Sequence, residues 1–138
     1  MAAPYDDQAR TATRVMKLDV VGLNYRLLPQ QRQKLATMVE RKPLACELER
    51  EPKNKYDKHA IKVNVNDLHL PGLKLPVRNG KLHIGYIRRG TAAVLAQGLD
   101  AKTLRVKSCR LTYVNSHGWG NVEVVFSKSP ASKRKTSS

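Results

Sequence analysis

Apolar and polar residues alternate over several short stretches of the chain, which is the pattern of half-buried β-strands. The stretches that read as strands are residues 14–25, 44–51, 60–65, 82–87, 104–114 and 122–126. Gly22 lies inside the first of them, where glycine permits a bulge or a close backbone approach. Six short strands of this kind predict a mainly β domain that forms a small barrel or a strongly bent sheet.

Two stretches have helical spacing instead. Pro29 suits a first helical turn, and the apolar residues of 30–40 fall on one face at three- and four-residue spacing. Thr91 is the expected N-cap of a second short helix over residues 92–99. The prediction is therefore a six-stranded fold with two short helices.

The ends of the chain differ in composition from its middle. Residues 1–14 are polar and unpatterned, which predicts a flexible arm, and residues 128–138 are basic and of low complexity, which predicts a disordered tail. The domain is expected over residues 15–127. Within it, residues 66–81 hold two prolines and two glycines and predict a long connection or protruding hairpin. One side of this segment is apolar and either packs on the core or contacts a protein partner.

The charge of the chain indicates which class of partner it binds. The chain carries 26 Lys and Arg against 11 Asp and Glu, a formal net charge of +15. Such an excess favours a polyanion partner, most often nucleic acid, over the alternative of a solvated basic surface. No apolar run approaches the ~18 residues of a membrane span, and the first ten residues (MAAPYDDQAR) lack the apolar segment of a secretory signal. We expect an intracellular protein of the nucleus or cytoplasm, or of a bacterial nucleoid.

Motifs of catalysis are missing from the sequence. It contains no phosphate-binding GxxxxGKS or GxGxxG, its four histidines lack metal-ligand spacing, and its carboxylates do not cluster as two-metal nuclease chemistry requires. We expect no enzyme, metal, cofactor or small-molecule substrate. Cys46 and Cys109 lie far apart in apolar strand patterns, so buried free thiols are favoured over a disulfide or metal pair.

The segment EPKNKYDKHAIKV (residues 51–63) places a polar turn between two predicted strands. The turn gathers an aromatic residue, Tyr56, with Asp57 and several lysines. Other aromatic residues, Tyr25, Tyr86 and Trp119, also lie beside cations or loops. Binders of single-stranded nucleic acid combine cations with aromatic faces on which bases stack, at ~1–3 kcal/mol per base. The alternative for Tyr25 and Tyr86 is packing against the core.

Three segments in this order resemble the HIRAN domain: VVGLNY (20–25), EPKNKYDKHAIKV (51–63) and HIGYIRRGTAAVLAQGLD (83–100). The resemblance covers roughly residues 16–114. It implies an OB-like β-barrel that binds single-stranded DNA, in some members at a free 3′-hydroxyl end. Asn24 departs from the pattern, because DNA-binding helicase members tend to carry arginine there. Residues 30–40 and 66–81 are longer than the pattern needs, and either segment is a candidate contact for a protein partner.

The resemblance also assigns a nucleic-acid-binding set, to which the neighbouring cations are added: Tyr25, Arg26, Asn54, Tyr56, Asp57, Lys58, Tyr86, Arg88 and Arg89. In this set Tyr25 and Tyr56 would stack the terminal bases. The Asp57 carboxylate would accept a hydrogen bond from the terminal hydroxyl and repel an internal phosphate. The alternative role for Asp57 is to stabilise its own turn.

The sequence therefore predicts a non-catalytic module that recognises single-stranded DNA, most favourably at a free 3′-hydroxyl end, and targets a repair or replication activity. One alternative is an RNA-binding structural subunit of a large ribonucleoprotein, which the high positive charge and basic ends would suit. A second alternative is a nuclease or a nuclease accessory, which the missing carboxylate cluster disfavours.

Overall fold

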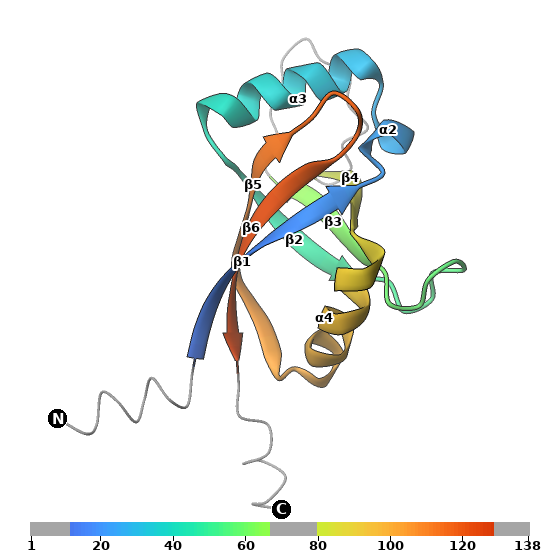
Figure 1. Ribbon diagram of the computed structural model, residues 1–138, viewed down its shortest axis with the longest axis vertical. Coiled ribbons are helices and arrows are strands. Elements are labelled where there is room, and N and C mark those ends of the chain that lie inside the picture. The colour runs from blue at the N-terminus through green and yellow to red at the C-terminus, as the bar shows by residue number, and fades with distance from the viewer. Residues whose placement is uncertain (1–11, 67–79, 129–138) are drawn as a thin grey trace, which may run out of the picture.

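The six strands of the protein close into an antiparallel barrel. The computed structural model describes residues 12–66 and 80–128. The strands follow one another around the barrel in the order β1-β4-β3-β2-β5-β6 (Figure 1). Their bounds are β1 (Ala12–Val21), β2 (Leu44–Arg50), β3 (Ile61–Asn66), β4 (Lys81–Ile87), β5 (Leu104–Val114) and β6 (Gly120–Lys128). The prediction of a mainly β, six-stranded barrel is confirmed.

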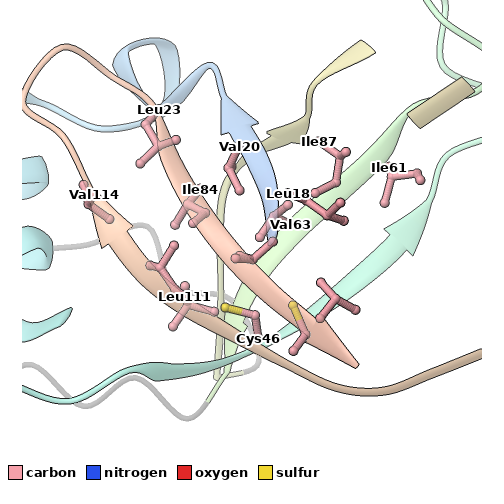
Figure 2. Packing of buried hydrophobic residues seen from close by; sticks show 14 of the residues in the cluster. Leu18, Val20, Leu23, Cys46, Ile61, Val63, Ile84, Ile87, Leu111 and Val114 are labelled. Carbon is pink, nitrogen blue, oxygen red and sulfur yellow. The ribbon is translucent and has the colours of Figure 1, made fainter. Parts of the chain in front are cut away.

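The barrel interior is built from the alternate apolar residues of the strands (Figure 2). In β6, for example, Val122, Val124 and Phe126 are buried while the residues between them are partly exposed. Such alternation places every second side chain in the core and leaves the others on the outer face of the barrel. Cys46 and Cys109 are buried free thiols of this core, as predicted. Outward-facing residues of neighbouring strands are therefore the ones available for binding.

Three helices lie among the described residues, one more than predicted: α2 (Leu23–Arg26), α3 (Pro29–Arg41) and α4 (Arg89–Ala101). The helix after Pro29 is confirmed, and its buried Leu35 and Val39 face the barrel. Figure 1 shows α3 across one end of the barrel and α4 toward the other. In α4 the small Ala92 and Ala96 are fully buried, which allows the helix to approach the barrel closely.

Two local predictions are wrong. Residues 23–25 do not continue the first strand but form α2, because Gly22 is not a bulge: its φ of 86° turns the chain out of β1 and makes it the N-cap of α2. Thr91 is not an N-cap either, since α4 already begins at Arg89 with Arg88 as its N-cap.

The predicted arm and tail fall almost wholly on residues 1–11 and 129–138, and most of the predicted 66–81 hairpin falls on residues 67–79. These three segments lie outside the described residues.

Candidate functional site

The loop between β2 and β3 is shaped by the side chain of Asn54. Its Oδ1 accepts hydrogen bonds from the backbone N–H of Tyr56 (2.9 Å) and of Asp57 (3.1 Å), and its Nδ2 donates to Glu51 Oε1 at 3.0 Å. An asparagine that bonds the backbone of following residues makes a tight turn. The turn leaves the Tyr56 ring 86% exposed. The sequence therefore builds a loop that presents an aromatic face to solvent.

Asp57 lies at the base of the same loop. Its Oδ1 accepts a hydrogen bond from the backbone N–H of His59 at 2.9 Å, and its side chain is only 19% exposed. The predicted alternative, that Asp57 stabilises its own turn, is thus present in the structure. Its Oδ2 faces Arg89, with the Arg89 Nε at 3.8 Å.

Arg89 connects this loop to α4. Besides its contact with Asp57, its Nη2 donates to the backbone carbonyl of Tyr56 at 3.4 Å. Arg89 is the first residue of α4, where the helix dipole adds positive potential. The structure thus brings Asn54, Tyr56, Asp57 and Arg89 together, although Arg89 is more than thirty residues from the loop in sequence. We call these four residues the Asp57 cluster.

Arg50 anchors the end of the loop that leads into β3. Its guanidinium forms a two-point ion pair with Asp100 of α4, with Nε–Oδ1 at 2.8 Å and Nη2–Oδ2 at 2.9 Å. The same guanidinium donates to the backbone carbonyls of Lys58 (3.0 Å) and Ala60 (2.8 Å). The hydrogen bond from the positively charged Arg50 lowers the pKa of Asp100 below its ordinary value. Arg50 therefore holds the loop against α4.

Tyr86 is joined to the loop through Glu51. The Tyr86 hydroxyl donates to Glu51 Oε1 at 2.9 Å. Burial raises the pKa of Glu51, but the hydrogen bonds from Asn54 and Tyr86, together with the Lys62 charge, outweigh burial and lower the pKa overall. Burial and the bond to Glu51 raise the pKa of Tyr86. The Tyr86 side chain is half-buried on the outer face of the barrel, so it is neither packed inside the core nor fully exposed.

Tyr25 and Arg26 lie on α2, not at the end of a strand. The Tyr25 ring is 87% exposed, so the alternative that it packs on the core is wrong. Arg26 is exposed, and its charge acts on His83 and Tyr86 of β4. Burial first, and then the charges of Arg26 and Lys62, lower the pKa of His83 to about 4. The α2 helix therefore lies beside β4, on the same side of the barrel as Tyr86.

The remaining predicted residues lie at the margin of the cluster. The Lys58 side chain is exposed, and the residue contacts the site through its backbone carbonyl, which accepts a hydrogen bond from Arg50. Arg88 points away from its neighbour Arg89, toward Asp19 of β1, with 3.9 Å between Nη1 and Oδ2. Arg88 and Asp19 line a shallow hollow together with Val21 and the exposed Trp119.

Sequence reasoning missed Arg50 and Asp100 as site-forming residues, and it did not assign Glu51 a role. Glu51 opens the segment that carries the resemblance, so its place in the motif was an available signal. The Arg50–Asp100 pair has no local signal, because the two residues are 50 positions apart. Among the described residues no group of three or more His, Cys, Asp or Glu is placed to hold a metal ion. None of the helices in residues 12–66 and 80–128 is long and apolar enough to cross a membrane.

A closed six-stranded barrel with an aromatic and charged loop cluster on its outer face defines an OB-like β-barrel domain. A family model of the HIRAN domain matches residues 14–127. The chain therefore belongs to the HIRAN domain family.

Solved structures share the fold. The crystal structure of the HIRAN domain of human HLTF matches with a TM-score of 0.60 at 21% identity, covering 93% of this chain and 88% of that one. The NMR structure of the HLTF HIRAN domain in its DNA-bound conformation matches at 0.56 and 21% identity, covering 96% and 90%. A protein from Lactobacillus plantarum matches at 0.56 and 20% identity, covering 86% and 98%. A search of curated protein sequences returned no match.

Proposed function

We propose that this protein binds single-stranded DNA at a free 3′-hydroxyl end and serves as a non-catalytic recognition module in DNA repair or replication. The observation that carries the proposal is the Asp57 cluster, in which a carboxylate held by its own loop faces an arginine and the preceding residue of the loop is an exposed tyrosine. Family membership supports it, because a HIRAN domain of HLTF has been determined in a DNA-bound conformation.

The chemistry of the cluster favours a strand end over a continuous strand. An ionised carboxylate accepts hydrogen bonds, so it can receive the proton of a terminal hydroxyl. A phosphate in the same place would meet a like charge, which is unfavourable at contact distance. A hydrogen bond to a charged group contributes about 1.5–3 kcal/mol, which corresponds to roughly ten- to a hundredfold in affinity. Tyr56 and Tyr25 offer exposed faces on which the terminal bases stack.

The site carries further cations besides Arg89. Arg89 faces Asp57, Lys58 is exposed on the same loop, and Arg26 is exposed on α2 beside β4. These side chains are placed to attract the phosphates that precede the terminal nucleotide. The proposal therefore assigns end recognition to Asp57 and backbone attraction to the arginines and lysines.

The test compares labelled oligonucleotides of one sequence that end in 3′-hydroxyl, 3′-phosphate or a blocked 3′ carbon, with a circular strand as the fourth ligand. Wild-type protein is expected to bind the 3′-hydroxyl DNA at least about tenfold more tightly than the others. In Asp57→Asn the charge is lost but an oxygen remains for the His59 N–H, so the preference over 3′-phosphate should shrink while the loop stays folded. Glu40→Gln, an equal change of charge on α3, should keep the preference.

Equal binding to all four ligands would refute end recognition. RNA versions of the same strands, at two salt concentrations, test the ribonucleoprotein alternative: equally tight, steeply salt-dependent binding of RNA with any end favours it. Magnesium added to the same samples tests the nuclease alternative, which predicts cleavage products.

A further inference from the structure

The outer face of β1, β6 and β5 carries a second group of cations, apart from the Asp57 cluster. Lys17 pairs with Glu123 across β1 and β6, and Glu123 pairs with Arg110 across β6 and β5, so these three side chains share one row. Further along β5, Lys107 lies at a bulge and Arg105 pairs with Ser127. We call Lys17, Arg105, Lys107 and Arg110 the β5 cation face.

Among the described residues, this charge is only partly neutralised. Glu123 accepts a 2.7 Å bond from Arg110 and offsets that one arginine. Within residues 12–66 and 80–128, the exposed Lys17, Arg105 and Lys107 form no ion pair. Exposed cations without an acidic partner attract phosphates, and the strands fix the backbone positions from which these three side chains extend.

Aromatic rings lie between the β5 cation face and the site. Tyr113 of β5 is exposed, and its ring centroid lies 5.5 Å from that of Trp119. Tyr113 pairs with Asn121, which pairs with Asp19, so this row is one step along the sheet from the row of Lys17. Cations interleaved with exposed aromatic rings are typical of surfaces that bind single strands.

The two surfaces are continuous. Val21 pairs with Tyr86, and Val21 also lines the hollow that contains Arg88 and Trp119. Val21 and Lys17 are four residues apart on one face of β1, which is ~13 Å at the rise of a β-strand. A strand that leaves the site over Val21 therefore reaches Lys17 within a few nucleotides.

The opposite direction is unfavourable for phosphates. On the other side of β4, beyond β3, the outer face presents Glu47 and Glu49 at alternate positions of β2. Lys81 contacts Glu47, and Lys62 lies 3.9 Å from Glu51, so the cations there are engaged by the acids. A polyanion is repelled from this side and attracted to the other.

We propose that a single strand whose end occupies the Asp57 cluster continues over Val21 onto the β5 cation face, which binds its upstream phosphates. The inference rests on the proposed function for the position of the strand end. It adds a direction of binding and a site longer than the terminal nucleotides. The occupant is the same single strand, not a separate partner.

The test is a length series of 3′-hydroxyl oligo(dT), at about 4, 8, 12 and 16 nucleotides, measured over a range of salt. The variant Lys17→Gln/Arg105→Gln/Lys107→Gln removes the unpaired cations. The matched control Lys34→Gln/Arg41→Gln/Lys42→Gln removes the same charge from exposed positions on α3 and its C-cap. Circular dichroism is used to check that both variants are folded.

For the wild-type protein, affinity should rise with the length of the oligonucleotide, and the decrease of affinity with salt concentration should be steeper for longer strands. The Lys17/Arg105/Lys107 variant should bind the shortest strand as wild type does but lose about tenfold for the longest, with a salt slope lower by about 2. The control should keep the gain with length. Affinity that is independent of length, or an equal loss in both variants, would overturn the inference.

The same series separates this inference from the proposed function. If the gain with length depends on Lys17, Arg105 and Lys107 but 3′-hydroxyl and 3′-phosphate strands bind equally, the cation face stands and end recognition fails. If the 3′-hydroxyl preference holds but the longest and shortest strands bind alike, end recognition stands and the cation face fails.

Discussion

The Arg50–Asp100 contact provides the sharpest test of how the loop is held. Arg50 is only 15% exposed and makes four hydrogen bonds, two to Asp100 and two to the backbone carbonyls of Lys58 and Ala60. Asp100 is 53% exposed. The two partners therefore contribute different amounts, and Arg50→Met and Asp100→Asn should not be equivalent.

The magnitudes follow from exposure and from what each change leaves behind. Asp100→Asn weakens a solvent-screened ion pair and should cost about 0.5–1 kcal/mol of the free energy of unfolding. Arg50→Met removes the same pair and also two hydrogen bonds from a charged donor, one to the carbonyl of the exposed Lys58 and one to the part-buried carbonyl of Ala60, which keeps the N–H of Glu51. The Arg50 change should therefore cost about 2–3 kcal/mol.

Urea unfolding of wild type, both single variants and the double variant gives these free energies and the coupling between the two residues. Oligonucleotide binding is measured on the same four proteins. Because ordering one backbone residue costs about 1–2 kcal/mol, a loosened loop should lower affinity by roughly tenfold in Arg50→Met and less in Asp100→Asn. Equal losses of stability in the two single variants would refute the assignment of the carbonyl contacts to Arg50.

Three further outcomes are expected. Gly85→Ala should cost about 2–3 kcal/mol in urea unfolding, because a Cβ there would lie 2.4 Å from the Val21 carbonyl oxygen, whereas Gly90→Ala, with open space around it, should not destabilise. As pH falls from 6.5 toward 4, His83 becomes protonated in the unfolded state but not in the folded state, so the free energy of unfolding should fall by about 1–2 kcal/mol after allowance for solvent exposure. Urea titrations at pH 7 and 4.5 measure this difference, and His83→Gln should make it smaller. Trp119 is the single tryptophan, so oligonucleotide binding should quench protein fluorescence, and an unchanged spectrum at saturation would place the strand elsewhere.

The barrel was predictable because its strands alternate cleanly. In β6 the sequence places apolar residues at every second position, and those residues are buried. The break at Gly22 was not predictable, since a glycine at that place is equally consistent with a bulge and with the positive φ that ends β1. The residues that follow Gly22 continue an apolar pattern, so nothing local distinguishes the α2 helix from more strand.

The candidate site, like the fold, has a part that could be predicted from the sequence and a part that could not. The turn of Asn54 was predictable, because it depends on hydrogen bonds within three residues. The contact of Tyr86 with Glu51 joins residues 35 apart and depends on how β4 and β2 close around the barrel. Arg88 and Arg89 illustrate the limit best. They are adjacent in sequence and were assigned one role, but the start of α4 sends Arg89 to the loop and Arg88 to Asp19.

The two roles considered for Asp57 are compatible in the structure, because its two oxygens have different neighbours. Oδ1 is used by the N–H of His59 and holds the turn. Oδ2 faces Arg89, but at 3.8 Å from Nε this contact is longer than a hydrogen bond, and the Arg89 side chain is largely exposed. A terminal hydroxyl that donates to Oδ2 therefore displaces no strong bond and leaves the turn intact. Under the proposed function, the carboxylate that stabilises the loop is also the group that would distinguish a hydroxyl from a phosphate, so loss of end preference in Asp57→Asn should come without loss of the fold.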